Sequence, residues 1–308
     1  MRKFLLISLC IVVLAAASVA QTNKHVHMVR TVQLTPQLPP AGLNITYNGG
    51  PIMNGNNSVY VIFYGTWSRN ARTIVENFLE NLGSSPLYAI NTMYFDNNNK
   101  HIKAGFRFNK TTNEFNDDYS LGKALQDADV QTIVSNAISG GHLPNDTDGV
   151  YFVLTATDVS ESFDGLTFCG FFCGYHGPST SIVSGETIKY SFVGNSGRCP
   201  TACDGNVAVY GDSTSPNGDV GGDGTVSIMF HELSESVTDP EVNMDNAWTG
   251  TFGENGDICN FNFGTTFIAG NGSHANQKLG GRPYLLQQMF KLTGQTPPVV
   301  PGICAQFK

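Results

Sequence analysis

The stretch from Val226 to Glu235 constrains the fold more than any other segment, because it predicts one helix with two chemically different sides. His231, Glu232 and Glu235 fall on one side, and the apolar residues gather opposite. We expect the apolar side to pack on a sheet, while the polar side either lines a cleft or faces water. The glycine-rich turn 218–224 is expected to precede this helix, and Pro240 to end it.

The same stretch is close to the His-Glu-x-x-His signature of zinc proteases, with Glu235 in place of the second histidine. Residues i and i+4 share a helix face, so His231 and Glu235 are candidate metal ligands. Glu232 is then the candidate base that takes a proton from water. Zinc accepts carboxylate oxygen, although a harder ligand set leaves the identity of the metal open.

A third ligand is expected downstream, in the segment 253–259. Glu254 is the first choice, because its distance from Glu235 resembles the ligand spacing of gluzincins. Asp257 and Asp239 remain alternatives. The cofactor expected from these residues is one zinc ion or none, and metal binding is better supported than catalysis.

Three further features have competing interpretations. His176 either donates to an oxyanion as part of a catalytic set or hydrogen-bonds within a disulfide loop, which is commoner for a lone histidine. Asp219 and Asp223 could bind calcium, but the spaced ligand set of a calcium loop is absent and a turn-forming role is favoured. Neither a phosphate-binding loop nor a Gly-x-Ser-x-Gly nucleophile motif occurs.

Residues 1–20 read as a secretory signal peptide, with Arg2-Lys3, an apolar run and a small-residue exit. Six cysteines follow it, an even number that suits three disulfides in an oxidising compartment. Fifteen pairings are open, and our choice is Cys169–Cys173, Cys199–Cys203 and Cys259–Cys304. Sequons at Asn44, Asn56, Asn109, Asn145 and Asn271 predict glycosylated surface loops. We therefore expect an extracellular protein without a membrane anchor.

The composition, 41% apolar and 14% charged, indicates a packed core rather than disorder. A net charge of −8 argues against nucleic acid as a partner. Residues 21–55 read as an extended leader, and 56–308 as a single domain of the α/β (α+β) class.

Periodicity predicts the order of the elements in this domain. Strands are expected at 59–64, 87–95, 104–108, 150–154, 188–193 and 207–210, and helices at about 68–82 and 127–138. This succession favours a zincin-like domain with a mixed sheet, packed helices and disulfide-stapled loops, although a fold analogy does not confer an activity.

The chain resembles the plant phosphate-induced protein family, also called the Exordium family, over most of its length after the signal peptide. Separated blocks carry this resemblance: YNGGPIMNGNNSVYVIFYGTWSRNARTIVENFLENL, FCGFFCGYHG, FVGNSGRCPTAC, NGDVGGDG and GGRPYLLQQMF. The resemblance implies an extracellular, often wall-associated protein linked to growth, with no agreed enzymatic reaction.

Three functional hypotheses follow. The first is a secreted Exordium-like protein of growth or wall-associated processes, which carries a metal site. The second is a secreted zinc metallopeptidase, so the sequence leaves open whether the chain is an enzyme. The third is a carbohydrate-binding wall module that uses Trp67, Tyr64, Trp248 and Tyr284, although core packing is favoured for most of these. The expected partner is an extracellular peptide or polysaccharide, and the oligomeric state is open.

Overall fold

The computed structural model describes residues 27–32 and 42–306. The predicted signal peptide and part of the predicted leader lie outside these residues. Within the described part of the chain, no helix has the length and apolar character needed to cross a membrane.

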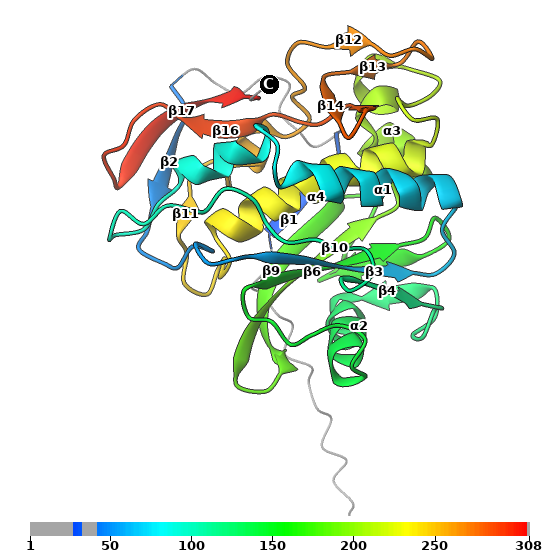
Figure 1. Ribbon diagram of the computed structural model, residues 1–308, viewed down its shortest axis with the longest axis horizontal. Helices are drawn as coiled ribbons and strands as arrows, with labels where there is room; N and C mark the ends of the chain where they lie inside the picture. The colour runs from blue at the N-terminus through cyan, green and yellow to red at the C-terminus, as the bar shows by residue number, and fades with distance from the viewer. Residues whose placement is uncertain (1–26, 33–41, 307–308) are drawn as a thin grey trace, which may run out of the picture.

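A mixed six-stranded sheet forms the centre of the molecule, in the order β1-β9-β10-β6-β3-β4 (Figure 1). The strands β10, β6, β3 and β4 pair in parallel, and β9 and β1 extend the sheet in antiparallel pairing. Their bounds are β1 His27–Arg30, β3 Ser58–Tyr64, β4 Glu114–Asp117, β6 Gly149–Thr155, β9 Phe172–Val183 and β10 Glu186–Gly194. The predicted mixed sheet is confirmed.

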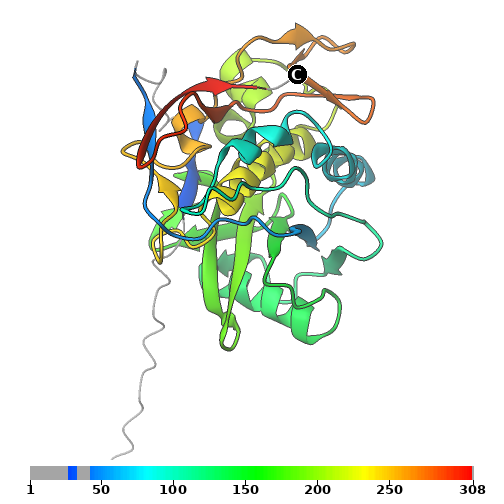
Figure 2. The ribbon, with the colours of Figure 1, turned by 60° about the vertical axis from the view of Figure 1, so that its left-hand side comes forward.

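Helices cover both faces of this sheet. Figures 1 and 2 show α1 (Arg69–Leu82) and α4 (Val220–Thr238) on one face and α2 (Asp127–Ser139) on the other. Ser68 caps α1, because its side chain accepts a hydrogen bond from the Ala71 N–H. Two-sided cover explains why β3 and β6 are buried at every position. The predicted helices at 68–82 and 127–138 are confirmed as α1 and α2, and the predicted strands at 59–64 and 150–154 as β3 and β6.

The helix α4 is enclosed by the rest of the protein. Every residue from Gly221 to Thr238 is buried, so neither alternative for its polar side, an open cleft or bulk water, describes the structure. The predicted glycine turn is also wrong, because the helix begins at Val220 and includes most of these glycines. A Cβ on Gly222 would lie 2.9 Å from Ala71 Cα, so the absent side chain lets α1 approach.

The remaining segments form short strands and single helical turns around this centre. A second sheet, in the order β11-β2-β17-β16, lies beside the α4 end of the molecule (Figure 1). The strands outside the central sheet, including the four of the second sheet, are β2 Asn44–Tyr47, β5 Ala124–Gln126, β7 Ser160–Phe163, β8 Leu166–Thr167, β11 Trp248–Thr249, β12 Phe267–Ile268, β13 His274–Ala275, β14 Gln277–Leu279, β15 Arg282–Tyr284, β16 Met289–Leu292 and β17 Val299–Ala305. The turns are η2 Tyr88–Met93, η3 Ser196–Arg198, α3 Pro200–Cys203, η4 Asn206–Tyr210 and η5 Asp257–Cys259.

Three predicted strands are wrong. The segment 87–95 contains the 3₁₀ helix η2, and its buried residues recur at a spacing near three rather than two. The segment 104–108 contributes one bridge, from Arg107 to Ser58, because Gly105 has a positive φ that interrupts the extended chain. The segment 207–210 lies in the π-helical turn η4, and so short an apolar run does not distinguish strand from helix.

The predicted leader is part of the fold where it is described. The strand β1 pairs with β9, and β2 pairs with β11 and β17. Four-residue strands carry too little pattern to be recognised before their partners are known.

All five sequon asparagines are exposed, as surface acceptors would have to be.

Three disulfides join the six cysteines, and two of the predicted pairs are wrong. Cys259–Cys304 is confirmed, whereas the other bonds are Cys169–Cys199 and Cys173–Cys203. The segments 169–173 and 199–203 each hold two cysteines four residues apart. Both bonds join one segment to the other, rather than closing a loop within a segment. Closing a 30-residue separation stabilises a fold by roughly 3 to 4 kcal/mol, and here it fixes β9 next to α3.

Candidate metal centre

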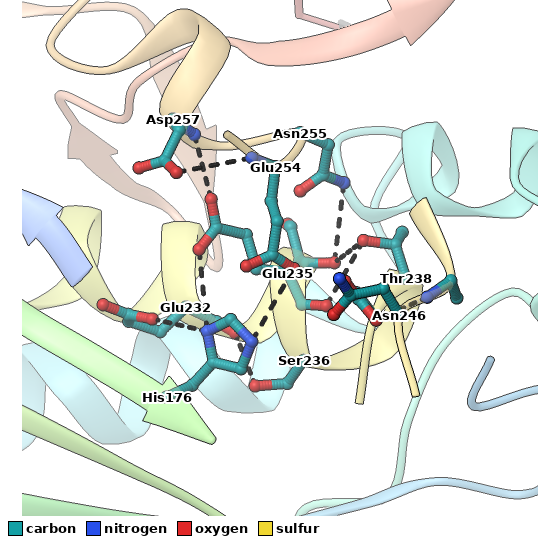
Figure 3. Close-up of polar contacts among 12 residues, drawn as sticks. His176, Glu232, Glu235, Ser236, Thr238, Asn246, Glu254, Asn255 and Asp257 are labelled. Atoms are coloured by element: carbon teal, nitrogen blue, oxygen red, sulfur yellow. Dashed lines mark hydrogen bonds and ion pairs between the residues drawn. The ribbon is translucent and has the colours of Figure 1, made fainter. Parts of the chain in front are cut away.

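Three segments bring six ionisable side chains together at the buried face of α4, and Figure 3 labels all of them except His231. The helix contributes the predicted ligands His231 and Glu235 and the predicted base Glu232. The strand β9 contributes His176, the loop before η5 contributes Glu254, and the first residue of η5 is Asp257. The six residues are His176, His231, Glu232, Glu235, Glu254 and Asp257.

The ligand atoms of these residues form two overlapping groups. One atom from each of His176, Glu235 and Glu254 lies within 4.8 Å of the others. The same limit holds for His231, Glu235 and Asp257. Two donors bound to one tetrahedral zinc ion are about 3.4 Å apart, so side chains whose ligand atoms lie within 4.8 Å of one another would need to draw closer around an ion.

The contacts around His231 are close but poorly aligned for hydrogen bonding. Its Nε2 lies 2.9 Å from Glu235 Oε1 and 3.6 Å from Asp257 Oδ1. Neither ring nitrogen makes a well-directed hydrogen bond, although the side chain is fully buried. The backbone N–H of Asp257 donates to Glu235 Oε1 at 2.9 Å, which holds the loop against the helix. A buried imidazole in this position fits a metal ligand, because a cation can occupy the direction that no proton acceptor takes.

His176 is held between carboxylates. Its Nδ1 lies 3.0 Å from Glu232 Oε2 and 3.6 Å from Glu235 Oε2, and its Nε2 lies 3.8 Å from Glu254 Oε1. Figure 3 shows these three acidic side chains reaching the ring from different directions. A carboxylate that accepts a bond from one imidazole nitrogen orients the other nitrogen toward a metal. Its side chain contacts acidic residues of the cluster, so a hydrogen bond confined to a disulfide loop does not describe His176, and its role as a donor to an oxyanion stays a prediction.

Burial makes the charge state of the cluster unusual. It raises the pKa of Glu232 well above its usual range, and the charge of Glu235 adds to this rise. The pKa of Glu254 is raised for the same two reasons. Burial alone would lower the pKa of His231, but the carboxylates of Glu235 and Asp257 outweigh it and raise that pKa. Protons on these groups would be replaced by a divalent cation, so the donor set and its charge fit a metal.

Two glycines make room for the cluster, and no sequence pattern distinguishes them from the other glycines of the chain. A Cβ on Gly256 would lie 2.7 Å from His231 Cδ2 and 2.9 Å from Glu235 Oε1. A Cβ on Gly174 would lie 3.1 Å from Glu232 Oε1. Both positions need a residue without a side chain. The residues next to them in the sequence do not indicate this need.

The other acidic candidates lie outside the two groups. Asp239 ends α4 and accepts a hydrogen bond from the Ala247 N–H at 2.7 Å. Asp219 caps the start of the same helix by accepting from the Gly222 N–H at 3.0 Å. Asp223 is buried and accepts hydrogen bonds from its neighbours. Asp219 caps α4 and Asp223 lies within it, so the favoured turn-forming role does not describe Asp223.

The aromatic residues considered for carbohydrate binding are mostly core residues. Tyr64, Trp248 and Tyr284 are fully buried, and Trp67 is half-buried. Trp248 Nε1 donates to the Phe95 carbonyl at 3.0 Å. These three rings therefore offer no exposed stacking face.

Comparison with known proteins identifies the relatives of the chain. Residues 45–293 match the family model described as the phosphate-induced protein 1 conserved region. The chain is 31% identical to Protein EXORDIUM-like 3 of Arabidopsis thaliana over 257 residues, which cover 77% of this chain and 74% of that protein. It is 28% identical to Protein EXORDIUM-like 5 of the same plant, covering 83% and 82% of the two chains. It is 30% identical to Protein PHOSPHATE-INDUCED 1 of Nicotiana tabacum, covering 65% and 66%.

No solved structure matches the chain. The family match spans most of the central sheet, the helix α4 and the loop that carries Glu254 and Asp257. The chain therefore belongs to the phosphate-induced protein 1, or Exordium-like, family.

Proposed function

We propose that this chain is a secreted Exordium-like protein that acts in growth or wall-associated processes through a buried metal centre. The observation that carries the proposal is the convergence of His231, Glu235 and a carboxylate from the loop, with His176 facing them from β9. Its partner outside the cell is a peptide or a polysaccharide. The three disulfides and the exposed sequons support the extracellular setting.

Zinc is the first choice of metal. Imidazole nitrogen and carboxylate oxygen both suit it, and three protein ligands leave one position open. In the sheet that carries the centre, β9 lies next to the edge strand β1 and packs against α4, and this arrangement is the basis for a zincin-like interpretation of the fold.

Metal analysis tests the proposal. The full secreted chain, stripped with a chelator, reloaded with zinc and dialysed, is expected to retain at least about one equivalent of the metal. His231→Gln should reduce this content, whereas His101→Gln, at an exposed histidine outside the cluster, should not. Retention below about one-tenth of an equivalent in the wild-type chain would remove the metal centre from the account.

Peptide hydrolysis is a second candidate function, favoured by the position of Glu232 beside both predicted helical ligands. A bound zinc ion would supply Lewis acidity and lower the pKa of water. Glu232 would take the proton from that water. His176 would hold the Glu232 carboxylate through their 3.0 Å contact.

Access is the physical obstacle to this second function. Five of the six side chains are at most 2% exposed, and that of Asp257 is 10% exposed. Hydrolysis therefore requires the loop at Asp257 to open. Glu232→Gln is expected to abolish cleavage of casein while metal content stays unchanged. Equal cleavage by the wild-type and Glu232→Gln chains would reject Glu232 as the base.

A further inference from the structure

The cluster contains two potential metal sites that share a single side chain. Glu235 belongs both to the group with His176 and Glu254 and to the group with His231 and Asp257. Each group otherwise has its own imidazole and its own carboxylate. From this geometry we propose that the protein binds a pair of divalent cations, with Glu235 as the bridging ligand, a proposal that rests on the metal centre proposed above.

The two oxygens of Glu235 face different imidazoles. Oε1 lies 2.9 Å from His231 Nε2, and Oε2 faces the His176 ring, 3.6 Å from the Nδ1 that contacts Glu232. A carboxylate in this orientation binds one cation through each oxygen, and cations in paired metal sites are about 3.5 to 4 Å apart. The two histidines belong to separate groups of ligand atoms, so a single cation would leave one of them outside its coordination sphere.

The histidines provide evidence that does not depend on the acidic residues alone. Both nitrogens of the fully buried His231 ring lack a well-directed hydrogen bond, and Nε2 points into the group with Asp257. On the other side, the contact between Glu232 and His176 Nδ1 leaves His176 Nε2 directed toward Glu254. Glu232 is then a positioning residue for the second site, as carboxylates behind metal-bound histidines commonly are.

The charges of the cluster are balanced by two cations. Glu232, Glu235, Glu254 and Asp257 carry four negative charges when ionised, and two divalent cations carry four positive charges. Histidine ligands bind metals in the neutral form, so the imidazoles do not change this balance. Charge balance matters here because the cost of burying an uncompensated carboxylate is several kcal/mol.

Stoichiometry tests the pair directly. The full chain, stripped with a chelator and titrated with Co²⁺, is expected to bind about two equivalents by mass spectrometry of the dialysed protein. Electron paramagnetic resonance should show a signal weakened by magnetic coupling between the two ions. One equivalent with an uncoupled signal would overturn the pair and leave the single metal centre intact. An absence of bound Co²⁺ and Zn²⁺ would overturn both.

Variants assign the two positions. His176→Gln and His231→Gln should each retain about one uncoupled ion, and Glu235→Ala should retain less than one, because a bridging ligand serves both positions. Glu232→Gln should weaken one position about 10- to 100-fold and leave the other unchanged, as expected of a positioning residue. His101→Gln, the matched exposed control, should behave as the wild-type chain. Unchanged stoichiometry in His176→Gln, with its disulfides intact, would contradict the shared-ligand arrangement.

Discussion

At the scale of single residues, the proposed metal centre would depend on close packing by a glycine as much as on its ligands. Replacing Gly256 by alanine would place a methyl group 2.7 Å from His231 Cδ2 and 2.9 Å from Glu235 Oε1. The ligands must then shift, and we expect Gly256→Ala to weaken metal affinity by about 10- to 100-fold. Competition with a chromophoric chelator measures this change. Gly270→Ala, where a Cβ meets no atom within 4 Å, is the control and should bind metal normally.

The separate residues of the candidate site were predictable to different degrees. His231 and Glu235 are one helical turn apart, so the sequence alone places them on one face. Glu254 and Asp257 were predicted as alternatives, whereas the structure brings both to the cluster. The contact of His176 with Glu232 spans 56 residues and depends on strand pairing and disulfides, which no local pattern encodes.

At the scale of elements, the close approach of α1 and α4 determines where the cluster lies. Alanine usually stabilises a helix by up to about 1 kcal/mol relative to glycine. At Gly222 the added Cβ would lie 2.9 Å from the Ala71 backbone, so we expect Gly222→Ala to destabilise the protein by about 1 to 3 kcal/mol. Urea unfolding with the disulfides intact measures this difference. A gain in stability would show that α1 does not pack against α4 as described.

Elements with a long pattern were predicted well, and short ones were not. The helices α1 and α2 have caps and apolar periodicity, and β3 and β6 are continuous apolar runs. The segment 87–95 was mistaken for a strand because its buried residues depend on packing against later parts of the chain. Tyr94, for example, donates through its hydroxyl to the Phe290 carbonyl. The cysteine pairs were mistaken for the same reason, since both crossed bonds require two distant segments to meet.

At the scale of the whole molecule, a buried carboxyl group makes stability depend on pH. Burial raises the pKa of Glu161 to about 9, and the Tyr175 hydroxyl donates to it. Between pH 4.5 and about 9 the unfolded chain loses this proton and the folded chain keeps it, so the group lowers stability as pH rises. The slope from Glu161 alone is about 1.4 kcal/mol per pH unit.

Glu161→Gln should therefore flatten the dependence of the unfolding free energy on pH across this range, because the neutral amide can still accept from Tyr175. Denaturant unfolding at several pH values provides the measurement. The exposed Glu80→Gln serves as the control and should leave the slope as it is in the wild-type chain. A slope that is equally steep in Glu161→Gln would mean that Glu161 is ionised in the folded protein.

The central claim, that Glu235 is the hub of a metal centre, is tested most directly by anomalous diffraction from zinc-loaded crystals, recorded on both sides of the zinc absorption edge. We predict density about 2.0 to 2.2 Å from a Glu235 oxygen and from a histidine nitrogen, with a second peak about 3.5 to 4 Å away. Zinc density confined to surface histidines, with none between β9, α4 and the loop at Asp257, would contradict it.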